Sequence, residues 1–133
     1  MGDHVKTTIQ KRLDFDAAHS LDFLPPDHKC ARVHGHTYVV DIEVQGEPDQ
    51  FGMLVDYGDL TAPIMAELDH RNLNDVPGLQ YPTTENVAKW ILHRLQRVAD
   101  AHAKSFHPPL GAVWRVSRVR VHESSSTWAE VVG

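Results

Sequence analysis

The sequence lacks a second cysteine: Cys30 is the only one in 133 residues. It cannot form an internal disulfide, so a reducing compartment is its natural environment. No apolar run approaches the length needed to cross a membrane. The first residues also lack the charged start and apolar core of a signal peptide. These absences argue against a disulfide-stapled or membrane-spanning protein, and we expect a cytoplasmic one that makes no membrane contact.

Basic side chains are too few for a nucleic-acid surface. The chain has 13 lysines and arginines against 18 aspartates and glutamates, a net charge of −5, whereas nucleic-acid binding needs a basic excess. This balance still leaves room for a local basic pocket that binds an anionic substrate. Repeats, low-complexity tracts and linkers are absent as well. We therefore expect one domain over residues 1–133, long enough to bury a core.

Histidine, in contrast, is abundant, with ten in the chain. The sequence is organised around the segment from Cys30 to His36, in which three residues separate Cys30 from a His-Gly-His. Side chains at i and i+2 of an extended strand point to the same face, so His34 and His36 can grip one metal ion. An open, catalytic zinc site needs a third protein ligand and leaves the fourth position for water or substrate.

The third ligand is predicted from two strands. Residues 7–19 and 33–45 both alternate between polar and apolar side chains. His19 lies at the end of the first apolar face, and His34 and His36 lie at the matching end of the second. A lone histidine at such a place is more often a hydrogen-bonded core residue. An antiparallel hairpin, however, brings His19 beside the other two, so three imidazoles converge at one end of a sheet.

The loop at 20–32 carries Cys30 between two cations, Lys29 and Arg32. Nearby positive charge favours the thiolate and lowers the pKa of a cysteine. The alternative is a small buried hydrophobe, which is the usual role of a free cysteine. A polar, charged loop fits that alternative poorly.

A first helix is expected after a turn at 46–49. Asp56 or Asp59 can cap its start, and a proline at position 63 is compatible with a helix only near the first turn. The helix should end near Leu68. Its apolar residues recur with helical spacing, and the stripe consists of Leu60, Ile64 and Leu68.

A second, longer helix is expected over residues 84–103. Thr83 or Thr84 can cap it, and Glu85 suits the positive first turn. Its predicted buried stripe consists of Val87, Ile91, Leu95 and Val98.

Between the helices stands an adjacent pair, Asp69 and His70. Aspartate and the asparagines that follow favour a turn. The alternative is a proton-transfer pair in which the carboxylate holds the imidazole. From the sequence alone, we prefer the turn.

The C-terminal part reads as two strands. A turn at 108–111 precedes a strand over 112–123, whose alternation changes phase near Ser117. That change predicts a bulge, or a strand buried on different faces at its two ends. Glu123 falls in register with the apolar face, where a carboxylate is costly without a partner. It could accept paired N–H donors of a ligand, or it could be an exposed strand end. A short last strand is expected at 128–131.

Five motifs occur together and in order in this sequence. They are Phe-Asp-Ala-Ala-His at 15–19, Cys-x3-His-Gly-His at 30–36, Leu-Asp-His-x-x-Leu-Asn at 68–74, Pro-Thr-Thr-Glu-Asn at 82–86 and Val-x-Val-His-Glu at 119–123. With them the sequence closely resembles the 6-pyruvoyl-tetrahydropterin synthase / 6-carboxy-tetrahydropterin synthase family over almost its whole length.

The resemblance implies a fold and an assembly. The fold is the tunnelling fold, an α+β architecture in the order ββααββ, with a four-stranded antiparallel sheet and two helices on one face. Subunits of this family join their sheets into barrels, usually as two stacked trimers, and place active sites between subunits. The resemblance therefore implies a homo-oligomer, a hexamer built as a dimer of trimers.

The resemblance also implies a chemistry. Zinc acidifies the vicinal hydroxyls of a pterin triphosphate substrate such as 7,8-dihydroneopterin triphosphate. A cysteine acts as general base, an Asp–His pair from a neighbouring subunit moves a second proton, and a glutamate anchors the pterin ring. Carried over residue by residue, the zinc ligands are His19, His34 and His36, the catalytic residues are Cys30, Asp69 and His70, and the substrate-binding residues are Glu123, Thr84 and Glu85.

The gap between the cysteine and the His-Gly-His favours one activity within the family. Three residues, as here, are similar to bacterial 6-carboxytetrahydropterin synthases of 7-deazapurine (queuosine-type) biosynthesis. The implied reaction is a carbon–carbon lysis that releases acetaldehyde and triphosphate. The alternatives are the sister 6-pyruvoyl-tetrahydropterin synthase, which eliminates triphosphate, and a non-catalytic pterin-binding protein with structural zinc.

Overall fold

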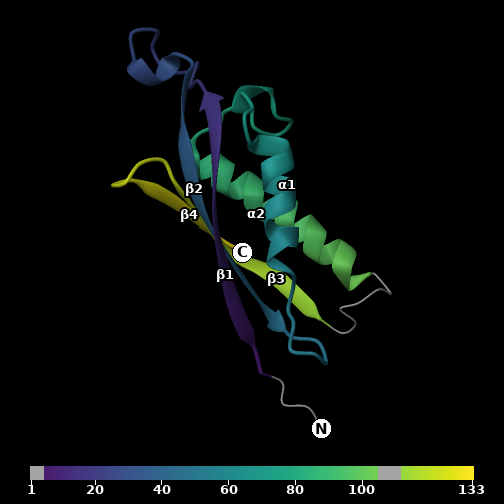
Figure 1. The fold of residues 1–133 in the computed structure, drawn as a ribbon. Helices are drawn as coiled ribbons and strands as arrows, with labels where there is room; N and C mark the ends of the chain where they lie inside the picture. Colours follow the sequence, from purple (N-terminus) through teal and green to yellow (C-terminus); the bar gives the residue numbers. More distant parts are fainter. Residues whose placement is uncertain (1–4, 105–111) are drawn as a thin grey trace.

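The computed structural model of the protein describes residues 5–104 and 112–133. Four strands form one antiparallel sheet in the order β1-β2-β3-β4, and both helices lie along one face of it (Figure 1). This is the implied architecture; the predicted turn at 108–111 lies outside the described residues. The elements are β1 (Thr7–His19), η1 (Lys29–Ala31, a 3₁₀ turn), β2 (His34–Glu47), α1 (Tyr57–Leu68), η2 (Leu73–Asp75, a 3₁₀ turn), α2 (Thr84–Ala103), β3 (Val113–His122) and β4 (Trp128–Val132).

The long hairpin of β1 and β2 has the predicted register. Its pairs run from Thr7 opposite Gly46 to His19 opposite His34. Burial alternates along both strands toward this end, because successive side chains of a strand point to opposite faces. The apolar face meets the helices, and the histidines continue that face to the end of the sheet.

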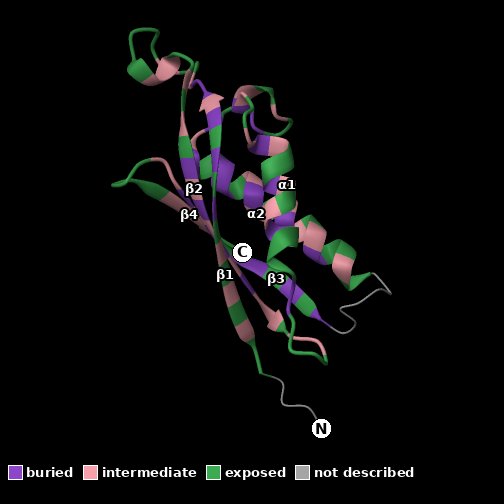
Figure 2. Ribbon diagram, in the orientation of Figure 1, coloured by how far each residue is buried: buried purple, intermediate pink, exposed green. Residues whose placement is uncertain are grey.

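The core fills the space between the sheet and the helices. α2 packs on β3 and β4, whereas α1 packs on β1 and on α2; buried residues are purple in Figure 2. The predicted stripe of α1 is fully buried, as are Val87, Ile91 and Leu95 of α2. Val98 is only partly buried, and Ala99 occupies the core in its place. Each large aliphatic side chain buried here contributes about 1.5–3 kcal/mol.

The first helix differs from its prediction in the position of its proline. Asp56 caps α1 by accepting a hydrogen bond from the Gly58 N–H (2.8 Å), so the helix begins at Tyr57. Pro63 is therefore the seventh helical residue and not part of the first turn. It removes one intrahelical hydrogen bond, which would otherwise reach the Asp59 carbonyl. Burial of Leu60, Ile64 and Leu68 offsets this loss.

The predicted bulge in β3 is confirmed. Glu43 pairs with Arg118 and Val44 with Val116, so Ser117 has no partner in the ladder. The buried Ser117 hydroxyl donates to the Glu43 carbonyl (3.0 Å) and contacts its carboxylate (2.9 Å). Because the bulge absorbs one residue, the apolar residues on both sides of it face the helices.

The turn predicted at 46–49 is wrong in its first half, because β2 continues to Glu47. Gly46 is a strand residue at a close approach of two strands. A Cβ added there would lie 2.0 Å from the Val113 carbonyl oxygen. The chain turns only afterwards, where the Asp49 carboxylate accepts from the N–H groups of Phe51 (2.8 Å) and Met53 (3.0 Å).

Among the described residues, no helix combines the length and the apolar character that a bilayer crossing requires.

We expect Gly46→Ala to lower the free energy of unfolding by about 1–3 kcal/mol, the usual cost of overpacking. Gly35→Ala in the same strand is the matched control, because its added Cβ would lie 3.5 Å from the nearest atom, the Ala17 carbonyl oxygen. Urea unfolding of both variants and the unmodified protein measures the difference. Equal stability of the two variants would contradict this close approach of β2 and β3.

Candidate metal centre and active site

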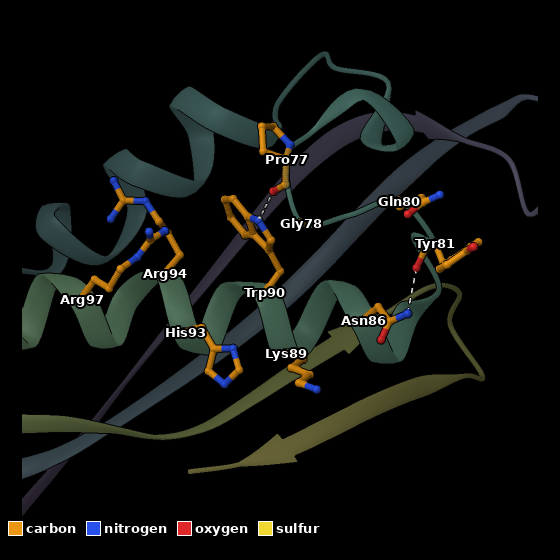
Figure 3. A pocket seen from close by; sticks show the side chains of 10 residues that line it. All are labelled: Pro77, Gly78, Gln80, Tyr81, Asn86, Lys89, Trp90, His93, Arg94 and Arg97. Atoms are coloured by element: carbon orange, nitrogen blue, oxygen red, sulfur yellow. Dashed lines mark hydrogen bonds between the residues drawn. The ribbon is translucent and has the colours of Figure 1, made fainter.

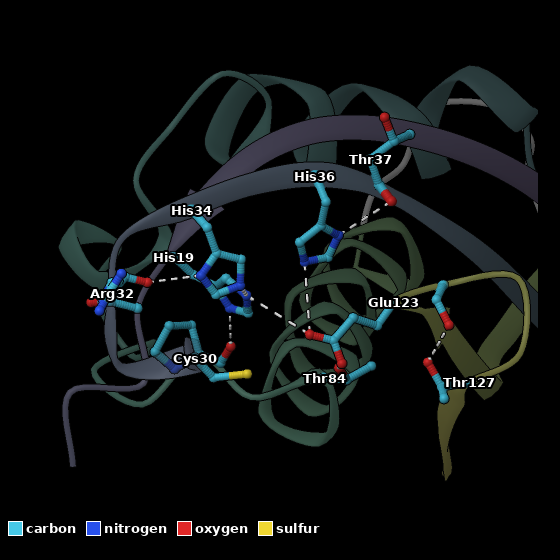
Figure 4. Close-up of polar contacts among 12 residues, drawn as sticks. His19, Cys30, Arg32, His34, His36, Thr37, Thr84, Glu123 and Thr127 are labelled. Atoms are coloured by element: carbon cyan, nitrogen blue, oxygen red, sulfur yellow. Dashed lines mark hydrogen bonds and ion pairs between the residues drawn. The ribbon is translucent and has the colours of Figure 1, made fainter. Parts of the chain in front are cut away.

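Three histidines meet at one end of the hairpin, as the alternation of the two strands predicts. The ring centroid of His19 lies 4.6 Å from that of His34 and 5.1 Å from that of His36. His19 is buried, and the other two rings are partly buried. Figure 4 shows the three imidazoles on the same side of the strands, with Glu123 beside them.

The outer nitrogen of each ring faces a backbone carbonyl. Nδ1 lies 2.8 Å from the Pro82 oxygen in His19, 2.8 Å from the Arg32 oxygen in His34 and, more loosely, 3.4 Å from the Thr37 oxygen in His36. A carbonyl only accepts hydrogen bonds, so Nδ1 carries the proton in each neutral ring. This assigns the lone pair to Nε2 in all three, the arrangement found in metal-ligating histidines.

The Nε2 atoms of the three histidines therefore carry no proton that could form a hydrogen bond. The Nε2 atoms of His19 and His34 are 3.1 Å apart, and with both Nδ1 atoms protonated no hydrogen lies between them. Nε2 of His36 is buried and has no hydrogen-bond partner among the described residues. Two nitrogens bound to one tetrahedral zinc ion would be about 3.3 Å apart, given its usual bond lengths. This donor set therefore fits a metal ion.

Burial also favours the ligand form of His19. Its pKa is lowered, mainly because desolvation penalises the imidazolium. A neutral imidazole is the form that binds a metal.

Glu123, the residue directly after β3, lies beside the histidines. Its Oε1 lies 3.8 Å from Nε2 of both His19 and His36, and possible ligand atoms of these three residues lie within 4.8 Å of one another. Its Oε2 accepts a hydrogen bond from the Thr84 hydroxyl (3.0 Å). The carboxylate is thus held between the first residue of α2 and the histidines, and Oε1 remains for a ligand.

His122, the residue before Glu123, fixes the end of β3 by contacts on the face of the sheet opposite the helices. Nε2 of His122 lies 3.1 Å from the Asp41 carboxylate, which also accepts two hydrogen bonds from Arg12 (2.6 and 3.0 Å). The Arg12 guanidinium is the main reason that the pKa of Asp41 is lowered. This polar contact keeps His122 turned away from the helices and Glu123 turned toward them.

Cys30 lies in η1, at the end of the loop that joins the two histidine-bearing strands. Its N–H donates to Nδ1 of His28 (3.0 Å), and its carbonyl accepts from the Leu21 N–H (2.8 Å). The side chain is partly buried. In Figure 4 the sulfur points toward the side on which Thr84 and Glu123 lie. The compact group of possible metal ligands in the described residues is His19, His36 and Glu123, and it includes neither Cys30 nor His34.

Asp69 and His70 contact each other and not the three imidazoles, although His70 and His36 both line one pocket of about 540 Å³. Nδ1 of His70 lies 2.9 Å from the Asp69 carboxylate, and 78% of the His70 side chain is exposed. The pair lies on the free edge of β1, where the His70 N–H donates to the Asp16 carbonyl (2.6 Å). The Asp69 carboxylate raises the pKa of His70, and His70 in turn lowers the pKa of Asp69.

The backbone of His70, which is hydrogen-bonded to the edge of β1, has an unusual conformation. His70 has φ of 58°, a left-handed conformation that is uncommon for a residue other than glycine. No hydrogen bond or ion pair links the pair to the histidine cluster within the described part of the chain.

Thr84 and Glu85, the two residues predicted to bind substrate from the motif at 82–86, differ in their surroundings. Thr84 is buried and bonded to Glu123, whereas Glu85 is exposed in the first turn of α2. Of this predicted pair, only Thr84 touches a group of the candidate site.

Two residues of the site are absent from the predictions. Tyr38 is fully buried, its ring lies 3.9 Å from that of His36, and its hydroxyl has no partner among the described residues. Burial, with a smaller effect of Glu123, raises the pKa of Tyr38. Tyr38 shares its strand face with the histidines, so alternation could have identified it. Pro82 acts through its backbone carbonyl; it belongs to the motif at 82–86, but its residue type does not reveal this contact.

Comparisons with known proteins match this chain to one family. A family model described as 6-pyruvoyl tetrahydropterin synthase matches residues 8–133. A putative 6-carboxy-5,6,7,8-tetrahydropterin synthase from Archaeoglobus fulgidus is 33% identical over 120 residues, 88% of each chain. The human 6-pyruvoyl tetrahydrobiopterin synthase is 34% identical over 143 residues, covering 94% of this chain and 90% of that protein. The solved structure of Caenorhabditis elegans 6-pyruvoyl tetrahydropterin synthase superposes with a TM-score of 0.75 at 27% identity, covering 100% and 99% of the two chains.

We expect His36→Ala to lower the affinity for a divalent metal ion by at least the 10–100-fold that loss of an outer-shell partner causes, because it removes a ligand outright. His93→Ala is the matched control, since that histidine is exposed on α2. Metal content after equilibration with limiting zinc and gel filtration is the measurement. Equal zinc retention by the two variants would rule out His36 as a ligand.

Proposed function

Because the chain belongs to the 6-pyruvoyl tetrahydropterin synthase family, whose enzymes are lyases acting on pterins, we propose that it is a zinc-dependent 6-carboxy-5,6,7,8-tetrahydropterin synthase. Its substrate would be 7,8-dihydroneopterin triphosphate, and its products would include acetaldehyde and triphosphate. The reaction would serve 7-deazapurine (queuosine-type) biosynthesis in the cytoplasm, within one tunnelling-fold domain.

The observation that carries this proposal is the pair of facing Nε2 atoms of His19 and His34, 3.1 Å apart. Both Nδ1 atoms are committed to carbonyls, so the two lone pairs repel unless a cation lies between them. His36 supplies the third nitrogen. A zinc ion held there would acidify the side-chain hydroxyls of the substrate and stabilise negative charge on them.

The chain's own residues then have distinct tasks. Cys30 removes a proton from the substrate side chain as general base. Glu123 accepts hydrogen bonds from the amino and ring N–H groups of the pterin through the oxygen that Thr84 leaves free. This fixes the orientation of the ring relative to the metal.

The second proton-transfer pair is best supplied by another copy of the chain. Asp69 and His70 are joined to each other and exposed at the edge of β1, where they suit the active site of a neighbouring subunit. We therefore propose a homo-oligomer, a hexamer built as a dimer of trimers. The Asp69 carboxylate keeps His70 protonated to higher pH than an isolated imidazole, which suits a proton donor.

The choice of product rests on the three-residue gap after Cys30, which favours the carboxy product. A 34% identical relative bears the pyruvoyl name, so the sister elimination of triphosphate is the second candidate. Incubation of the zinc-loaded protein with 7,8-dihydroneopterin triphosphate separates them. We expect equal amounts of acetaldehyde and 6-carboxytetrahydropterin by mass spectrometry. A pyruvoyl product without acetaldehyde would establish the sister activity, and an unchanged substrate would leave only a binding role.

Replacing the proposed base tests the role of Cys30. We expect Cys30→Ala to lower turnover by about 10²–10⁴-fold, the usual contribution of a general base, while the zinc content stays unchanged. Asp22→Ala in the same loop is the control, because that side chain is exposed, and it should leave turnover as it is. Full activity of Cys30→Ala would refute the role of Cys30 as general base. Loss of zinc from this variant would indicate that the cysteine is a metal ligand instead.

A further inference from the structure

A groove lies on the outer side of α2, away from the sheet. It has a volume of about 740 Å³ and runs between the helix and the segment at 77–81. Figure 3 shows the lining side chains: Trp90, Arg94 and Arg97 extend from α2 on the side of Pro77, and Lys89 and His93 extend from the opposite side of the helix in this view. This volume is in the range of small-molecule sites. None of the residues proposed for the pterin reaction lines it.

The wall of the groove is fixed by two side chains of α2. Nε1 of Trp90 donates to the Pro77 carbonyl (3.0 Å), and Nδ2 of Asn86 donates to the Tyr81 carbonyl (2.9 Å). Gly78 has φ of +88°, and a Cβ there would lie 3.3 Å from the Trp90 ring. The loop is thus pinned at both ends against the helix, so the groove is formed before any ligand arrives.

Basic side chains and no acidic ones line the groove, in a protein with a net charge of −5. Lys89, His93 and Arg97 are spaced four residues apart along α2 and are exposed, so each is a neighbour of the next on the helix surface. Arg94 is neutralised by Glu67 (2.9 Å). Lys89 and Arg97 have no ion pair within the described residues, so both can bind an anion, and the local field favours one.

Aromatic faces accompany these cations. Tyr81 is 50% exposed, and its ring is supported by an edge contact with Phe23 (5.6 Å between centroids). Trp90 lines the groove beside it. Exposed aromatic rings stack on nucleobases, and nearby cations bind the attached phosphates. We propose that this groove is a second binding site, for a phosphorylated nucleotide, with phosphates on Lys89 and Arg97 and the base on the aromatic side.

Calorimetric titration of the full-length, zinc-loaded protein with ATP tests this site. We expect ATP to bind at least tenfold more tightly than either tripolyphosphate or adenosine, because each of these has only half of the contacts. The double variant Lys89→Ala/Arg97→Ala should bind ATP at least tenfold more weakly, and Tyr81→Ala about tenfold more weakly. Lys104→Ala, an exposed lysine at the end of the same helix, should bind like the unmodified protein.

Two controls make the outcome independent of the pterin reaction. Phosphates can bind zinc, so the titration is repeated with His36→Ala, which lacks a proposed metal ligand, and binding should persist there. Loss of binding in His36→Ala would place the nucleotide at the metal centre and overturn the proposal. The same follows if ATP does not bind, if the double variant binds it normally, or if tripolyphosphate binds as tightly as ATP and Tyr81→Ala has no effect.

Discussion

The pairing of His19 with His34 across the first hairpin is the constraint on which the candidate site depends. Slipping either strand by one residue would turn every side chain to the other face and scatter the imidazoles. The register is maintained by the core immediately below. Phe15 lies opposite Tyr38, and their rings stack with centroids 5.0 Å apart. The forces that stabilise the sheet therefore also position the nitrogens, so the site and the core share one strand face.

The support behind the histidines comes from distant parts of the chain. The carbonyl that orients His19 belongs to Pro82, just before the Thr83 cap of α2. The hydroxyl that holds Glu123 belongs to Thr84, the first residue of that helix. The start of one helix thus orients both His19, a proposed metal ligand at the end of β1, and the carboxylate of Glu123, which follows β3. Residues 82–84 contain no metal-binding side chain, yet they belong to the candidate site because they hold His19 and Glu123 in place.

Alternation along the strands was enough to predict the hairpin, its register and the convergence of three histidines, because strand parity is a local property. The phase change near Ser117 predicted either a bulge or a strand buried on different faces at its two ends, and the pairing of β2 with β3 shows the bulge. Gly46 was misassigned because glycine next to glutamate and proline suggests a turn, whereas the backbone of β3 requires a residue without a side chain there. Asp69 and His70 could not be placed from spacing, since their position depends on pairing with the outer edge of β1. Their proposed role came from the family resemblance and not from geometry.

The bulge at Ser117 also determines which residue type reaches the histidines. If β3 paired regularly through this point, Ser117 would face Glu43, and each later residue would move by one position. His122 would then lie opposite Tyr38 on the helix side, an imidazole in place of the Glu123 carboxylate, and Val119 and Val121 would turn outward. The polar group that completes the site is thus selected by the exclusion of one serine, six residues earlier, from the hydrogen-bond ladder.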